Sequence, residues 1–163
     1  MSYGLGNHLE NVWKTAAELE GLDLPPNEFV ARNCKAFQKT IAIAASLATI
    51  MGIVLIVCLD VEIGSLFLAC GVALLLLLPT ILSYQCHVDK TCLREEYYLL
   101  FFKRRKEILW SDVAYRKIVA GRGRTITLYD KNKKRLISFD DTVVGYDRIV
   151  KLAKRSGIKE MYK

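Results

Sequence analysis

Two long stretches without a charged residue dominate the hydropathy pattern of the chain. The first covers residues 40–59, "TIAIAASLATIMGIVLIVCL", and the second covers residues 63–83, which contain "LFLACGVALLLLLPTIL". A helix needs about 20 apolar residues to cross the hydrocarbon core of a bilayer. The alternative, a helical hairpin buried in a soluble protein, fits poorly because so short a chain has little to cover both helices on all sides. The pattern therefore predicts a transmembrane helical hairpin over residues 39–83.

Both stretches carry small residues at four-residue spacing, which lets helix backbones approach closely in lipid. The predicted helix-packing positions are Ala44, Ala48, Gly52, Ser65, Ala69 and Ala73. These positions would pack within the hairpin, between copies in a homo-oligomer, or against another membrane protein. Neither stretch contains an Asp, Glu, Lys, Arg or His, which argues against a proton or ion pathway through them.

The segment before the hairpin, residues 1–38, is predicted to be helical and cytoplasmic. Apolar residues recur on one stripe of a helix over residues 5–20. Its charges are mostly acidic, unlike those of a lysine-rich membrane-surface helix, so we expect it to dock on protein. Pro25 and Pro26 end this helix and can open a second one, which would carry Phe29, Val30 and Phe37 toward the first span.

The segment after the hairpin, residues 84–163, alternates apolar and polar positions with the period of two that is typical of strands. "KIVAGRGRTITLYDKNKKRLISF" predicts three strands separated by turns at "GRGR" and "DKNKK". "YYLLFF" (97–102) predicts a buried strand, "KRRK" (103–106) the turn that follows it, and "EILW" the returning strand. An amphipathic helix is predicted over residues 143–156, with Gly157 as its stop.

These elements predict an α+β chain, in which a two-span hairpin is joined to a small antiparallel β-barrel or sandwich with one C-terminal helix. Trp110 follows Ile108 and Leu109 just before a Ser-Asp turn. We expect its large ring to be buried at one end of the β unit.

The charge distribution predicts the orientation of the hairpin. Residues 84–163 hold 20 Lys or Arg against 10 Asp or Glu, within a chain of net charge +7. Arg32, Lys35 and Lys39 flank the first span, whereas the "DVE" connection at 60–62 contains no cation. The positive-inside rule then predicts a multi-pass protein of the cell membrane with both termini in the cytoplasm and Asp60 and Glu62 outside.

Part of the C-terminal half resembles a known class of domain. "ILWSDVAYRKI" (108–118), "TITLYDKNKKRLISF" (125–139) and the terminal helix resemble the pleckstrin-homology-like domains of membrane-anchored bacterial proteins. The resemblance implies a small split barrel capped by the helix. It also implies a binding scaffold without catalytic residues.

Candidate catalytic and metal-binding chemistry is sparse in this sequence. His8 and His87 lie on opposite sides of the hairpin in sequence, and "GRGR" lacks the spacing of a nucleotide-binding loop. Asp140 and Asp141 are interpreted as turn and cap residues. The five cysteines include no CxxC pair, so they predict neither a disulfide framework nor a zinc site, and unpaired thiols fit a reducing cytoplasm. We therefore expect no enzyme activity, no cofactor and no metal.

The predicted function is a non-enzymatic, membrane-anchored interaction module with a basic cytoplasmic domain. Its candidate lipid- or partner-binding residues are Lys103, Arg104, Arg105, Lys106, Arg122, Arg124, Lys131, Lys133, Lys134 and Arg135. Basic residues near an anionic leaflet gain about 1 kcal/mol each, although a solvated face without a ligand would show the same pattern. The alternative function is an accessory subunit that binds another membrane protein through its helices. Nucleic-acid binding is disfavoured, because the aromatic residues of 97–102 are expected in the core rather than on a stacking platform.

Overall fold

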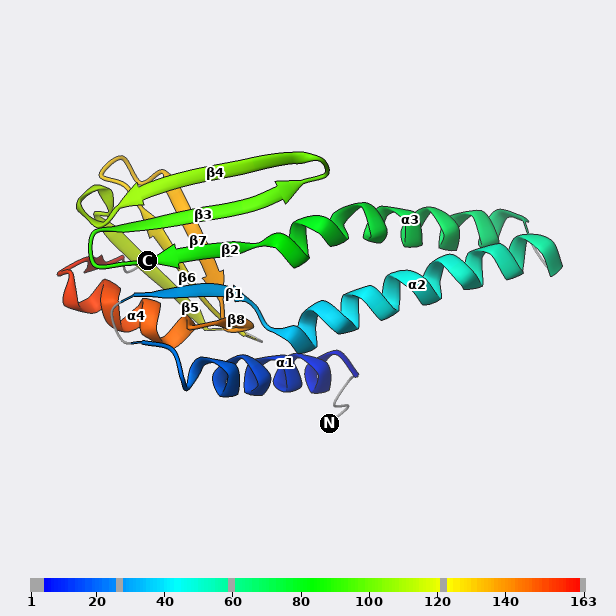
Figure 1. Cartoon of the computed structure of the whole chain (residues 1–163), viewed down its shortest axis with the longest axis horizontal. Helices are drawn as coiled ribbons and strands as arrows, with labels where there is room; N and C mark the ends of the chain where they lie inside the picture. The colour runs from blue at the N-terminus through cyan, green and yellow to red at the C-terminus, as the bar shows by residue number, and fades with distance from the viewer. Residues whose placement is uncertain (1–4, 26–27, 59–60, 121–122, 162–163) are drawn as a thin grey trace.

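The computed structural model describes residues 5–25, 28–58, 61–120 and 123–161. Its elements are α1 (Leu5–Gly21), β1 (Phe29–Asn33), α2 (Lys35–Cys58), α3 (Val61–Ser83), β2 (Gln85–Val88), β3 (Cys92–Leu99), β4 (Phe102–Leu109), the short 3-10 helix η1 (Trp110–Asp112), β5 (Tyr115–Ala120), β6 (Arg124–Tyr129), β7 (Arg135–Asp140), β8 (Val143–Val144), α4 (Tyr146–Arg155) and β9 (Lys159–Glu160). In Figure 1 the α2–α3 hairpin projects from one end of a β-rich domain, and α1 lies beside the base of α2. The predicted α+β class is confirmed.

The helices α2 and α3 are 24 and 23 residues long and apolar enough to cross a membrane by length and composition. They pack against each other at backbone distance. A Cβ added to Gly52 would lie 2.5 Å from the backbone nitrogen of Leu68, and one added to Gly71 would lie 2.6 Å from that of Thr49. Only glycine therefore fits at these crossing points, which is typical of helix pairs in lipid.

Strand β1 corrects the prediction of a second N-terminal helix. Phe29 and Ala31 are buried, whereas Val30 is half-buried and Arg32 is exposed, so this stretch follows the period of a strand. It pairs with β2 on one side, where Phe29 lies opposite Val88, and with β8 on the other. Residues from both sides of the helical hairpin therefore share one sheet.

The β-rich domain contains two sheets around one hydrophobic core. The first has the strand order β4-β3-β2-β1-β8 and the second has the order β7-β6-β5-β9. All pairings are antiparallel except β5 with β9, which is parallel. Within the described residues the two sheets do not close into a barrel. The prediction of a sandwich with a C-terminal helix thus agrees with the structure, and the prediction of a barrel is wrong.

The predicted C-terminal helix and the predicted buried tryptophan are both present. Helix α4 is shorter than the predicted range 143–156, because Val143 and Val144 form β8 instead. Gly157 follows the helix with a φ of 71°, the left-handed conformation expected of its stop. Trp110 is 7% exposed, and its indole N–H donates to the Asp89 carbonyl oxygen at 2.9 Å.

Candidate functional site

The β3–β4 hairpin places "YYLLFFKRRK" differently from the prediction. Residues 103–106 lie within strand β4 rather than in a turn, and the turn lies between Leu99 and Phe102, which are opposite each other in the ladder. Leu100, the first turn residue, has a φ of 56°, which is unusual for a residue with a side chain. The charges suggested a turn at 103–106, but the cross-strand pairs of this ladder place the reversal before them.

The tip of this hairpin, Tyr98–Phe102, is an exposed apolar surface. Phe101 is 90% exposed and Phe102 is 70% exposed, and the other three residues are between 42% and 46% exposed. The core of the domain begins farther along the same strands, where Leu93 and Ile108 are buried opposite each other. The prediction that 97–102 forms a buried strand is therefore wrong for the tip, because the hairpin extends past the edge of the second sheet (Figure 1).

The four cations of β4 alternate between the two faces of the hairpin. Lys103 and Arg105 bind the Glu96 carboxylate on the neighbouring strand, at 2.9 and 3.5 Å. The hydrogen bond from Lys103 holds the pKa of Glu96 below its ordinary value. Lys106 donates to the carbonyl oxygen of Leu136 in the other sheet. Among the described residues, Lys103 and Arg105 are the members of the four that make ion pairs, whereas Arg104 and Lys106 make none.

The other predicted basic residues do not join this group. Lys131, Lys133 and Lys134 lie in the exposed turn between β6 and β7, and Arg135 begins β7. Arg122 lies outside the described residues. Arg124 begins β6 and takes part in a separate polar cluster.

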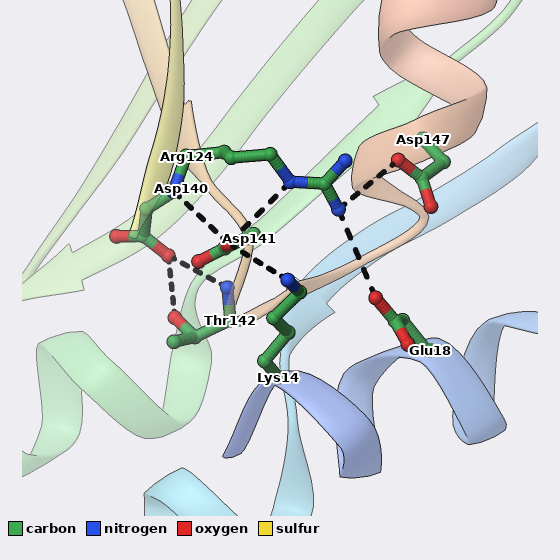
Figure 2. Close-up of polar contacts among 7 residues, drawn as sticks. All are labelled: Lys14, Glu18, Arg124, Asp140, Asp141, Thr142 and Asp147. Carbon is green, nitrogen blue, oxygen red and sulfur yellow. Dashed lines mark hydrogen bonds and ion pairs between the residues drawn. The ribbon is translucent and has the colours of Figure 1, made fainter. Parts of the chain in front are cut away.

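That polar cluster joins three parts of the fold around Arg124 (Figure 2). The Arg124 guanidinium lies 3.7 Å from the Asp141 carboxylate, 3.5 Å from Asp147 at the start of α4 and 3.7 Å from Glu18 of α1. It also lies over the ring of Tyr146, 5.4 Å from its centroid. Asp141 is 5% exposed and accepts the backbone N–H of Arg124 at 3.0 Å.

A cavity of about 360 Å³ lies beside the cluster, between α1 and α4. Its charged lining residues are acidic Glu18, Asp141 and Asp147 and basic Arg124, Arg148 and Lys151. The Arg148 guanidinium donates to the backbone carbonyl oxygens of Leu22 and Leu24, which follow α1. These matched charges hold α1 against the domain, which is a structural task.

The interpretation as a turn residue fits the side chain of Asp140, whereas the Asp141 side chain, interpreted in the same way, contacts other elements. The Asp140 carboxylate accepts the backbone N–H of Thr142 at 3.1 Å, as turn chemistry requires. Asp141 instead is buried among cations from other elements, including Lys14 at 4.0 Å. Nothing near it in sequence indicates those partners.

The cysteines and histidines of the described residues form no group that could hold a metal ion. Cys86 is buried and His87 is exposed, on opposite faces of β2 as the alternation predicts. Burial raises the pKa of the Cys86 thiol to about 12.

The predicted small-residue positions divide between two environments. Gly52 packs against α3, and Ala48 is half-buried. Ala44, Ser65, Ala69 and Ala73 face away from the partner helix and are exposed. Gly64 and Gly71, which were not predicted, supply the contacts on α3. Packing of the exposed positions against another chain stays a prediction.

Comparisons of the chain with protein-family models, with curated proteins and with solved structures found no match in any of the three.

Proposed function

We propose that the chain is a non-enzymatic membrane module, in which α2 and α3 span the bilayer and hold the β domain at its cytoplasmic face. The observation that carries the proposal is the exposure of the two helices. Only 11% of the most apolar window of α2 and 6% of that of α3 is buried within the protein. The core helix of a soluble protein would be mostly covered by its own chain.

The exposed apolar surface of these two helices is suited to contact with lipid. Residues such as Ile43, Leu47 and Val57 on α2 and Leu66 and Leu76 on α3 are each at least half exposed. Contiguous apolar surfaces of this length are not tolerated in water, and they mark contacts with a membrane or a partner. Their length matches the bilayer as well, since 23 residues at 1.5 Å each give a helix of about 34 Å.

The fold supports placing both flanking segments on one side of the membrane. Strand β1 ends just before α2 and β2 begins just after α3, and the four residues of β2 pair with the first four residues of β1. The segment before the hairpin and the segment after it must therefore lie on the same side. The cations Arg32, Lys35 and Lys39 at this end favour the cytoplasmic side.

The pleckstrin-homology-like character of the domain is part of this proposal. Two packed sheets with one helix after the last long strand support it, and so does the structural role of the contacts around Arg124. The acids and bases there neutralise one another and connect α1 to the domain. The domain would act by presenting its surface, as a binding scaffold does.

The test of the proposal combines extraction with labelling of the full chain in cells. After alkaline carbonate washing the protein should stay with the membranes, and release into the wash would overturn the two spans. For orientation, Val61→Cys, at the far end of the hairpin and 66% exposed, should react with an impermeant thiol reagent in intact cells once the native cysteines are replaced. The matched control is Ser111→Cys on the domain surface, which should react only after permeabilisation. The reverse labelling pattern would invert the orientation.

A further inference from the structure

We propose that the β3–β4 hairpin tip, Tyr98–Phe102, inserts into the interfacial layer of the leaflet that lies against the β domain. The bilayer would then be contacted at a third place, outside the two spans. This inference rests on the proposed function, because it requires α2 and α3 to lie in lipid.

The tip is attached to the base of α3. The backbone N–H of Tyr98 donates to the Ser83 Oγ at 2.8 Å, so β3 runs directly beside the last turn of the helix. Figure 1 shows the β3–β4 hairpin extending beyond the end of β2, beside the domain-side end of α3. Two more residues at about 3.3 Å each bring the turn roughly 7 Å beyond Ser83. A helix rises 1.5 Å per residue, so the turn lies level with about Pro79.

The level of Pro79 is also the domain-side edge of the apolar part of the α2–α3 hairpin. Thr49 lies beside Gly71 and Ile56 lies beside Gly64, which sets the antiparallel register of α2 and α3. Continued toward the domain, this register brings Thr40 opposite about Thr80. Thr40 is the first residue of the charge-free stretch, directly after Lys39. The hairpin tip therefore reaches the depth at which the hydrocarbon begins.

The side chains of the tip suit that depth. Phenylalanine and leucine are typical of the apolar face of interfacial segments, and Phe101 and Phe102 are the two most exposed residues of the tip. Directly behind them on β4 follow Lys103, Arg104 and Arg105, at the level of anionic headgroups. An apolar tip backed by cations is the arrangement that interfacial membrane contacts use.

A second aromatic residue, Trp13 of α1, lies at the level of Thr40, beside α2 rather than α3. The indole N–H of Trp13 donates to the Thr40 Oγ1 at 3.2 Å, and its ring meets Phe37 edge-on at 5.1 Å between centroids. Trp13 lies on α1 and the tip lies between β3 and β4, so two unrelated elements place aromatic rings at one depth. This agreement favours a lipid boundary over a protein partner as the occupant of the tip surface.

The experiment uses the full chain in vesicles that contain anionic lipid brominated in the acyl chains, which quench nearby tryptophan. The probe is Phe101→Trp in a Trp13→Phe background. Trp110 is buried in the domain core and contributes a constant signal. The matched control is Asn132→Trp in the exposed β6–β7 turn. Thr142, just after β7, accepts the Cys34 N–H at the base of α2. The β6–β7 turn lies at the other end of β7, which is the end away from α2 and α3 in Figure 1.

Lipid insertion predicts at least twofold stronger quenching by brominated lipid for Phe101→Trp than for Asn132→Trp, and weaker quenching by aqueous acrylamide. Equal lipid quenching of the two variants would overturn the inference. Protection of Phe101→Trp from both quenchers would also overturn it, because a second copy or another protein would then cover the tip. Carbonate washing of the same vesicles tests the two spans separately from the insertion of the tip. If the protein stays with the vesicles but brominated lipid does not quench Phe101→Trp, only the insertion of the tip is refuted.

Discussion

Phe29 precedes the helical hairpin by only a few residues, yet the structure makes it part of a core that lies mostly after the hairpin. Its side chain is 6% exposed and packs in one cluster with Val88, Leu93 and Tyr146. It also fills the space left by Gly145, where an added Cβ would lie 2.6 Å from the phenyl ring. We predict that Phe29→Ala destabilises the whole β domain.

The expected size of the effect follows from the burial of the ring. Removing a fully buried phenylalanine side chain costs about 3–5 kcal/mol, because the cavity closes only in part. Typical total stabilities are roughly 5–15 kcal/mol. At about 4 °C per kcal/mol for a domain of this size, the melting temperature should fall by about 12–20 °C.

Buried thiols provide the assay in detergent solution. Cys86 and Cys92 are free and at most 5% exposed, and burial raises the pKa of the Cys86 thiol to about 12, so it is unreactive in the folded state. A thiol-reactive fluorogenic dye then reports unfolding on heating. The exposed thiols of Cys58 and Cys70 are replaced by alanine in every variant to remove background.

Val30→Ala is the matched control, because Val30 is the next residue of β1 and is half-buried on the other face of the sheet. It should change the melting temperature by no more than a few degrees. If the Phe29→Ala and Val30→Ala proteins have the same melting temperature, the assignment of β1 to the core is refuted. It would also restore the prediction that residues 84–163 form the domain alone.

The same melting assay tests three further predictions. Gly52→Leu should cost at least about 1–3 kcal/mol, because its Cβ would lie 2.5 Å from the backbone nitrogen of Leu68; no effect would refute the close helix packing. Trp110→Phe should cost about 1–2 kcal/mol through the hydrogen bond lost to the Asp89 carbonyl, and Trp110→Ala about 3–5 kcal/mol, so equal melting of the two would contradict this order. Hydrogen bonds, chiefly from Thr91, hold the pKa of the Asp89 carboxyl below its ordinary value, so its contribution is complete above about pH 4 and is lost as the pH falls. Asp89→Asn should therefore lower the melting temperature at pH 7 and differ less from the unmodified chain at pH 3; a constant difference would argue against this linkage.

The sequence predicted those features of the candidate site that depend on residues close together in the chain. The cations of 103–106 were recognised from composition, but their place in strand β4 depends on the ladder that sets Leu99 opposite Phe102. The exposure of Phe101 follows from the second sheet ending short of the tip, and no residue of the hairpin encodes where that sheet ends. The partners of Arg124 come from α1, the segment after β7 and the start of α4, so they are visible only once the chain has folded.

The sequence by itself determined the elements whose signals are local. Charge-free runs specified α2 and α3, and alternation specified β5, β6 and β7. The amphipathic period and Gly157 specified α4. Tertiary structure alone decided the role of β1, because five residues are too few for a decisive pattern and their partners follow more than 50 residues later, beyond the helical hairpin. It also decided the depth of the hairpin tip, since that depth depends on the Tyr98–Ser83 contact and on the register of α2 against α3, two interactions between segments that are separate in sequence.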